Sequence, residues 1–320
     1  AYTNMTSDIL KARSDAKLNQ GQNFSRLMSF AMYGPKSPAT NLLTEAELTN
    51  MNPQELVDRI HNQNSYKHRI LYYGPSSSKD LLATINQYHQ VPAALKDIPA
   101  GNEYSYLETP VTKVLVAPYD AKQIYMAQIS NLDKKYDPAI EPIRALYDEY
   151  FGGGMNSIVF QEMRETRGLA YSAWASIMPP SYLKYPYVLR TQIATQNDKM
   201  AQAIDAFDEI INNMPESEAA FKLAKESVLT NLRTSRTIKD EVLWKYIANK
   251  DLGVTEDRNK AIFEKVQDMT FADLKAAQEQ WIKDRKYTYC ILGDLKDLDQ
   301  DYLRKLGTVQ IVSQKEMFGY

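Results

Sequence analysis

The sequence predicts an α+β fold in which strands come early in a domain, helices follow, and the domain is duplicated. Three observations lead to this prediction: a pattern that recurs after about 219 residues, short stretches that alternate apolar and polar side chains, and longer stretches with helical apolar stripes. The apolar fraction of 44% is ordinary for a protein that buries a core.

The repeat consists of two similar stretches. Each contains a capped helix that leads to an apolar strand. Both helices have a polar N-cap, Asn52 in the first and Thr270 in the second, and both strands end at a glycine. This ordered set of features indicates a duplicated domain. The matched stretches are 50–56 with 68–74, and 268–274 with 287–293.

The second copy contains a full set of elements. Its strand at 185–196 places Tyr187, Leu189, Thr191 and Ile193 on one face, with Arg190, Gln192 and Gln196 on the other. Its helix at 198–214 has a stripe of Met200, Ile204, Phe207 and Ile211. Further strands are expected at 112–119, 123–131 and from Tyr171, and further helices at 138–150, 217–236, 239–251 and 256–267.

The first copy contains only the later half of this pattern. We therefore predict the C-terminal half of a truncated α+β repeat at 1–98 and a complete α+β domain at 99–320. The alternative is a divergent protein with a helical N-terminal extension.

Composition excludes several partner classes. The net charge is −2 and no basic block is interleaved with aromatic residues, so nucleic acid is not an expected partner. No apolar run approaches the ~18 residues that indicate a membrane span. Cys290 lies in an apolar strand and is predicted to be a core residue, which is compatible with the cytoplasm and the bacterial periplasm alike.

Metal-binding and nucleophile motifs are absent from the sequence. The three histidines, His61, His68 and His89, do not occur with the spacing of HExxH or HxxEH, and there is no GxSxG. The glycines at 152–154 lack the Lys-Ser/Thr of a phosphate-binding loop. We therefore expect no metal ligands and no cofactor site in this chain.

The stretch from Phe151 to Met178 carries the most specific signals. Gly152, Gly153 and Gly154 form a loop, and a short helix is expected to follow with Asn156 as its N-cap. Met155 and Phe160 are placed as a hydrophobic staple across that cap. Gly168 is expected to end the helix.

Arg164 and Tyr171 lie at the two ends of this junction, one near the end of the helix and the other at the start of a strand. A guanidinium and a phenol are both donors suited to a carbonyl oxygen or a developing oxyanion. The alternative interpretation is structural, with Arg164 paired to Glu162 or Glu165 on the surface and Tyr171 in the core.

The stretch GGGMNSIVFQEMRETRGLAYS, residues 152–172, resembles the signature of the non-catalytic domains of the pitrilysin/insulinase family of zinc metallopeptidases, which includes mitochondrial processing peptidase. The specific part is an arginine, six intervening residues and a tyrosine, with Gly168 and Leu169 in GLAY. The resemblance implies repeated domains, each a mainly antiparallel sheet with helices packed on one face.

The resemblance also implies a division of labour. Zinc and the HxxEH motif are expected in an N-terminal catalytic half, in the same parent chain or in a companion subunit, and a peptide is the expected substrate. Arg164 and Tyr171 match the pair that holds the scissile carbonyl and the oxyanion, and Gly152, Gly153 and Gly154 match the glycine stretch beside the substrate cavity. This chain alone is then not expected to hydrolyse peptides.

Two other functions stay open at this point. A family member that has lost catalysis would serve as a scaffold or assembly subunit, although such a protein has no need of Arg164 and Tyr171. A free-standing binding module is the third interpretation. An HxxEH motif upstream or in a companion chain distinguishes the peptidase from both.

Overall fold

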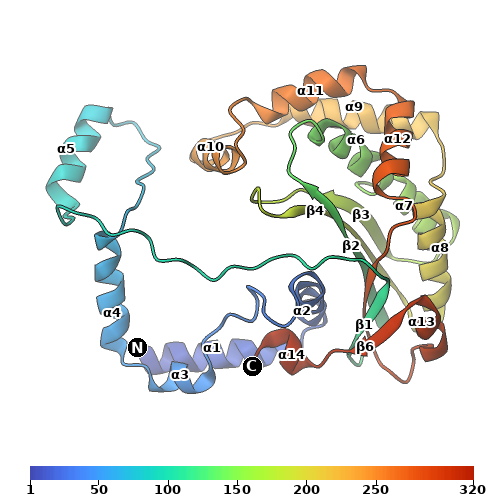
Figure 1. Cartoon of the computed structure of the whole chain (residues 1–320), viewed down its shortest axis with the longest axis horizontal. Coiled ribbons are helices and arrows are strands. Elements are labelled where there is room, and N and C mark those ends of the chain that lie inside the picture. The colour runs from blue at the N-terminus through green and yellow to red at the C-terminus, as the bar shows by residue number, and fades with distance from the viewer. The chain divides into compact units, whose positions relative to one another are not determined.

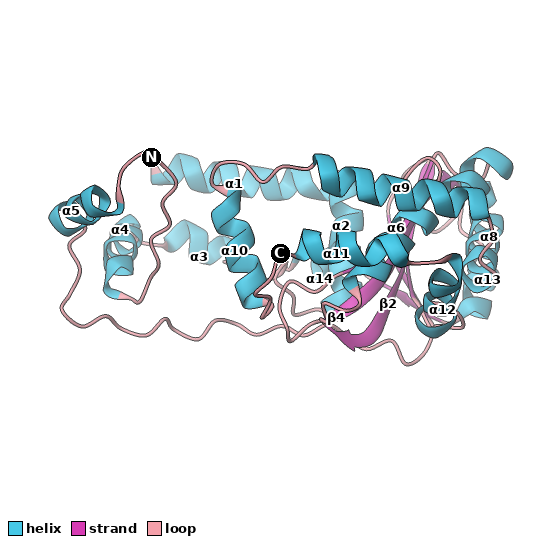
Figure 2. Cartoon of the chain, turned by 90° about the horizontal axis from the view of Figure 1, so that it is seen from above, coloured by secondary structure: helices cyan, strands magenta, loops and turns pink.

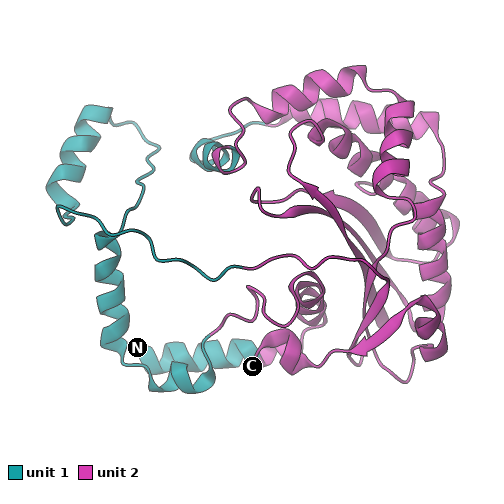
Figure 3. Ribbon diagram, viewed as in Figure 1, with its two compact units in different colours: residues 1–13, 43–103, 236–249 teal, residues 14–42, 104–235, 250–320 magenta.

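The computed structural model describes residues 1–320, which form two compact units (Figure 3). The smaller unit consists of residues 1–13, 43–103 and 236–249, and the larger consists of residues 14–42, 104–235 and 250–320. The predicted boundary between a truncated repeat at 1–98 and a complete domain at 99–320 stays a prediction.

The larger unit is built on a six-stranded sheet with the strand order β3-β4-β2-β5-β1-β6 (Figure 1). β2 pairs antiparallel with β4 and β5, and β3 pairs antiparallel with β4, whereas β1 runs parallel to β5 and β6. The predicted mainly antiparallel sheet is confirmed. Its strands are β1 (Lys113–Pro118), β2 (Gln123–Lys135), β3 (Ser172–Met178), β4 (Pro186–Gln196), β5 (Thr288–Gly293) and β6 (Thr308–Ile311).

The alternation predicted for β4 decides which face of the sheet carries the main core. Tyr187, Leu189, Thr191 and Ile193 are all buried, while Arg190 and Gln192 on the opposite face are only partly covered. Aromatic and β-branched side chains at these buried positions favour a pleated strand with one dry face.

A layer of helices covers the dry face, as Figure 2 shows in cyan against the magenta strands. The predicted stripe of α8, which contains Met200, Ile204, Phe207 and Ile211, is buried in the main core. Of these helices, α6 (Glu141–Phe151), α8 (Met200–Asn212) and α13 (Gln300–Leu306) contact strands, whereas α9 (Glu218–Thr234), α11 (Arg258–Asp268) and α12 (Phe271–Trp281) pack against α6. A short 3₁₀ turn, η3 (Asn197–Lys199), precedes α8.

The opposite face of the sheet is partly covered as well, which the sequence did not predict. α2 (Gln20–Tyr33) packs on β5, β1 and β2, and α14 (Gln314–Phe318) packs against α2. Phe24 and Leu27 of α2 join Cys290 in a second buried cluster. This explains why every residue of β5 is buried, and it confirms Cys290 as a core residue whose pKa is raised to about 12 by burial.

The smaller unit is helical and buries few side chains. Its helices are α1 (Tyr2–Lys17) and α10 (Glu241–Asp251), which both extend into the larger unit, together with α3 (Glu45–Asn50), α4 (Pro53–Asn62), the 3₁₀ turn η1 (Gln63–Ser65) and α5 (Ser78–Tyr88). Asn52 caps α4 as predicted, by accepting from the Gln54 N–H. α4, α5 and α10 contain no buried residue.

The strand predicted at 68–74 is not formed. The only bridge nearby joins Tyr66 to Lys96, and Ile70 and Tyr73 are exposed. A strand needs a neighbour to receive its backbone hydrogen bonds, and the smaller unit forms no strand that could pair with this segment. None of the helices in the chain has both the length and the apolar character that crossing a bilayer requires.

The buried carboxyl of Asp208 on α8 makes the stability of the larger unit dependent on pH. Burial raises its pKa to about 6, although hydrogen bonds from Tyr289 and Gln128 oppose the shift. Because this pKa lies above the ordinary value of 3.8, the stabilising contribution is full below about pH 4 and is lost as the pH rises through about 6.

We therefore predict that the free energy of unfolding of the wild type falls by roughly 2 kcal/mol more between pH 4 and 7 than that of Asp208→Asn. Urea denaturation at several pH values measures this difference. Asp301→Asn, which changes an exposed carboxylate on α13, serves as the control and keeps the wild-type dependence. Parallel pH profiles for the wild type and Asp208→Asn would contradict the assignment.

Candidate functional site

The glycine loop after α6 presses against the backbone of β3. A Cβ atom on Gly152 would lie 2.1 Å from the carbonyl oxygen of Ala175, and one on Gly153 would lie 2.8 Å from the carbonyl oxygen of Asp148. At Gly154 the nearest atom would be 3.9 Å away. Packing therefore accounts for the first two glycines, and only Gly154 is free of such contact.

Asp148 holds the same part of β3 from the last turns of α6. Its carboxylate accepts from the Ile177 N–H at 2.7 Å, from the Ser176 hydroxyl at 3.1 Å and from Arg144 at 2.8 Å. β3 is an edge strand, so these contacts occupy part of its outer edge. Burial raises the pKa of Asp148 to about 6, against the opposing effect of Arg144.

The short helix α7 (Ile158–Phe160) begins one residue later than predicted. Ser157, not Asn156, is the N-cap, and its hydroxyl accepts from the Phe160 N–H. The reason is a tight turn in which the Ser157 N–H donates to the carbonyl of Gly154 at 3.0 Å. With the cap moved, Met155 no longer takes the staple position, and it is exposed.

Arg164 lies in a π-helical segment, η2 (Gln161–Thr166), that continues α7. The Arg167 N–H donates to the carbonyl of Glu162, five residues back, at 3.2 Å. The segment then ends at Gly168, which has φ of 58°, while the Leu169 N–H donates back to Met163 at 2.9 Å. Single turns of π-helix are frequent at functional sites.

The structure brings the side chains of Arg164 and Tyr171 together. The guanidinium carbon of Arg164 lies 5.4 Å from the centroid of the Tyr171 ring and 5.0 Å from that of Phe160. Tyr171 immediately precedes β3, is 76% exposed, and its hydroxyl makes no hydrogen bond within the chain. Both side chains therefore present donors to solvent.

The two arginines of this junction, Arg164 and Arg167, differ in their ion pairs. Arg167 is held by Glu209 at 2.8 Å and by Glu162 at 3.5 Å, which ties the junction to α8. Arg164 has only Glu165, at 3.5 Å, and both side chains of that pair are about half exposed. A pair of this kind contributes about 0–1 kcal/mol, so it leaves Arg164 available to a ligand.

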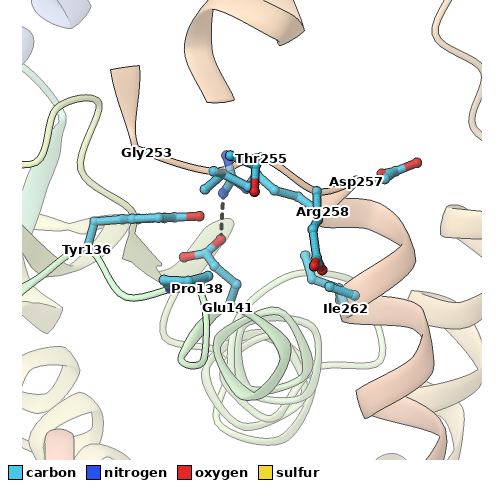
Figure 4. A pocket seen from close by; sticks show the side chains of 11 residues that line it. Tyr136, Pro138, Glu141, Gly253, Thr255, Asp257, Arg258 and Ile262 are labelled. Carbon is cyan, nitrogen blue, oxygen red and sulfur yellow. Dashed lines mark hydrogen bonds and ion pairs between the residues drawn. The ribbon is translucent and has the colours of Figure 1, made fainter. Parts of the chain in front are cut away.

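Away from this junction, a cavity of about 190 Å³ lies where α6 and α11 begin (Figure 4). At its side the buried carboxylate of Glu141 pairs with Arg258 at 2.8 Å and Arg144 at 3.1 Å, and accepts from the Tyr187 hydroxyl at 2.7 Å. Burial alone would raise the pKa of Glu141, but Arg144, Tyr187 and Arg258 together lower it. These contacts join α6, α11 and β4, so Glu141 is a structural residue.

No group of three or more histidine, cysteine, aspartate or glutamate side chains is placed to share a metal ion.

The structure does bring together two histidines that the sequence gave no reason to pair. The Nε2 atoms of His68 and His89 lie 2.7 Å apart, and Nδ1 of His68 lies 2.6 Å from the carbonyl oxygen of Tyr66.

Comparisons with known proteins agree on one fold. The family model of the peptidase M16 inactive domain matches residues 70–228. No curated protein sequence matches the chain significantly. The solved structure of a peptidase M16 inactive domain from Pseudomonas fluorescens is 18% identical with a TM-score of 0.66, covering 92% of this chain and 70% of that one.

Two further solved structures share this fold at lower identity. A chain of complex III from Candida albicans is 14% identical with a TM-score of 0.62, covering 95% of this chain and 74% of that one. The periplasmic protease PqqL from Escherichia coli is 12% identical with a TM-score of 0.62, covering 92% of this chain and 32% of that one. At these identities the likeness concerns the fold alone.

The contacts of the glycine loop predict that Gly154 tolerates substitution by alanine and that Gly152 does not. Gly152→Ala should lower the free energy of unfolding by about 2–3 kcal/mol, because the new methyl group meets the backbone of Ala175 and forces it to move. Gly154→Ala, the matched control, should change it by less than about 0.5 kcal/mol. Urea denaturation measures both, and equal tolerance at the two positions would refute the packing role of Gly152.

Proposed function

This chain belongs to the peptidase M16 family and matches its inactive domain, and from this premise we propose that it is the metal-free C-terminal part of a zinc metalloendopeptidase. In this proposal a separate N-terminal half, in the same parent chain or in a companion subunit, carries the zinc site. The present chain closes over a peptide substrate and positions it.

The observation that carries the proposal is the exposed pair of Arg164 and Tyr171. The guanidinium of Arg164 lies against the ring of Tyr171 at 5.4 Å, on a π-helical turn and a strand start that are both anchored by backbone hydrogen bonds. If Arg164 only stabilised the fold, it would be expected to pair with Glu162 and Glu209. These carboxylates pair with Arg167 instead. Two rigidly mounted donors without strong partners are suited to an acceptor from outside the chain.

The chemistry follows from the two donor types. The phenol of Tyr171 and the guanidinium of Arg164 donate hydrogen bonds to the scissile carbonyl oxygen, and these bonds strengthen as negative charge develops on that oxygen. Removal of one such donor costs about 3–4 kcal/mol of transition-state stabilisation in well-studied enzymes. The zinc ion, when bound in the other half, supplies Lewis-acid polarisation of the same carbonyl and activation of water.

The path of the peptide is constrained by the edge of β3. Gly152 and Asp148 already occupy this edge at Ala175 and Ile177, so a peptide has no free backbone groups to pair with there. Access is better at the start of the strand, beside Tyr171. We therefore place the scissile bond at the Tyr171 end and assign Gly154, the uncontacted glycine, to the substrate side of the loop.

A scaffold or assembly subunit without catalysis is the second candidate. The chain of complex III from Candida albicans shares the fold, which supports this alternative at the level of architecture. The exposed donors Arg164 and Tyr171 favour the peptidase, because a scaffold gains nothing from them.

We predict that Arg164→Ala and Tyr171→Phe each lower peptide turnover about 100-fold when this chain acts with the zinc-bearing half. The thermal unfolding temperature should stay within a few degrees of the wild type, because both side chains are exposed. Turnover is measured with a quenched fluorescent peptide, and unfolding by circular dichroism.

Arg304→Ala is the matched control, since Arg304 is an exposed helix arginine with one aspartate partner at 2.7 Å. It should retain wild-type turnover. If the double variant Arg164→Ala/Tyr171→Phe also turned over at the wild-type rate, the proposed roles of both residues would be untenable.

A further inference from the structure

Arg190 is a partly buried cation that has no carboxylate partner in the chain. It lies on β4, opposite Ser176 of β3 and Ile129 of β2. The Arg190 side chain forms one hydrogen bond, from its NH2 group to the Gln192 side-chain oxygen at 3.2 Å, and its buried Nε has no acceptor. Burial lowers the pKa of Arg190, and no nearby carboxylate opposes that shift.

Three other partly buried arginines of the larger unit have the acceptors that Arg190 lacks. Arg144 and Arg258 pair with buried or half-buried carboxylates. Arg285 donates to the backbone carbonyls of Trp281, Asn131 and Leu132. A desolvated charge without such partners is costly to the fold, so its presence at Arg190 calls for a partner from outside the chain.

The surroundings of Arg190 form an open face with further recognition groups. The indole of Trp174 lies 5.0 Å from the guanidinium carbon, and Trp174 pairs directly with Gln192 across the two strands. α2 covers β5, β1 and β2 on this face, so Trp174, Ser176, Arg190 and Gln192 stay only partly covered on the β3–β4 side. In Figure 1, the labels β3 and β4 mark this end of the sheet, and α2 lies away from it.

We propose that Arg190, Trp174 and Gln192 form a subsite for a carboxylate, carried by an aspartate or glutamate side chain of an extended peptide. Trp174 covers a face of the guanidinium, and its two terminal NH2 groups, rather than the buried Nε, are the pair of donors that matches a carboxylate. The Gln192 side-chain oxygen is directed to Arg190, so its amide N–H groups are free to donate to the same ligand.

This subsite rests on the proposed function, because it takes the ligand to be a peptide, and it adds a preference for acidic sequences. Arg190 is a partly buried cation that forms no ion pair within the chain. Removal of that cation should therefore leave the stability of the chain unchanged or improve it, as is common where a site is built at the expense of stability.

Binding of two labelled, capped peptides to the intact chain tests the subsite. The probes are Ala-Ala-Glu-Ala-Ala and the same peptide with glutamine in place of glutamate, measured by fluorescence anisotropy. The wild type should bind the glutamate peptide about tenfold more tightly. Arg190→Met should bind both equally, and Arg190→Lys should keep about a threefold preference, because lysine retains the charge but lacks the planar fork.

Two controls make the outcome decisive. Arg304→Met removes an exposed arginine elsewhere and should keep the full preference. Arg190→Met should also unfold at or above the wild-type temperature.

The subsite is refuted if the wild type does not distinguish the peptides, if Arg190→Met still does, or if Arg190→Met unfolds several degrees lower. None of these results bears on turnover by Arg164 and Tyr171, so failure of the subsite and failure of the proposed function are distinguishable.

Discussion

The close contact between the end of α6 and the backbone of β3 is the constraint on which the candidate site depends. Gly152 reaches the Ala175 carbonyl at a distance that excludes a side chain, and Asp148 accepts from the Ile177 N–H beside it. The chain that leaves this contact turns at Gly154, whose carbonyl accepts from the Ser157 N–H, and then enters α7. The π-helical turn and Gly168 then return it to β3 at Tyr171. Arg164 and Tyr171 are adjacent because both ends of this loop are held on one strand.

Several arginines of the larger unit have close carboxylate partners, and two that the proposals use do not. Arg144, Arg258 and Arg167 are matched by carboxylates and join α6, α11, α8 and β4 into one core. Arg164 and Arg190 have no comparable partner, and each lies against an aromatic ring instead. Stacking leaves the donor edge of a guanidinium free, whereas a bidentate ion pair uses it. In our proposals these two arginines therefore meet other molecules, Arg164 through a carbonyl oxygen and Arg190 through a carboxylate.

The sequence predicted the architecture of the larger unit well, because its strands and helices carry strong periodicity. The stripes of α8 and β4 are buried as expected, and the junction from Arg164 to Tyr171 has the predicted helix-to-strand form. The cap at Ser157 was missed because two adjacent residues, Asn156 and Ser157, are both good N-caps, and only the turn at Gly154 decides between them. The segment 68–74 has strand propensity but no neighbour to pair with. The isolation of Arg190 was invisible in the sequence, since alternation shows which face a residue takes and not which partners it finds there.

In our proposal, Arg164 and Tyr171 bind the carbonyl oxygen more strongly in the transition state than in the substrate. The most direct test compares a phosphinic peptide, which mimics the tetrahedral intermediate, with the corresponding uncleaved peptide, both bound to the assembly of this chain and its zinc-bearing half. We predict that Arg164→Ala weakens binding of the phosphinic peptide about 100-fold and that of the substrate peptide only a few-fold. Equal losses for the two ligands would show that Arg164 contributes only uniform binding and would contradict the account.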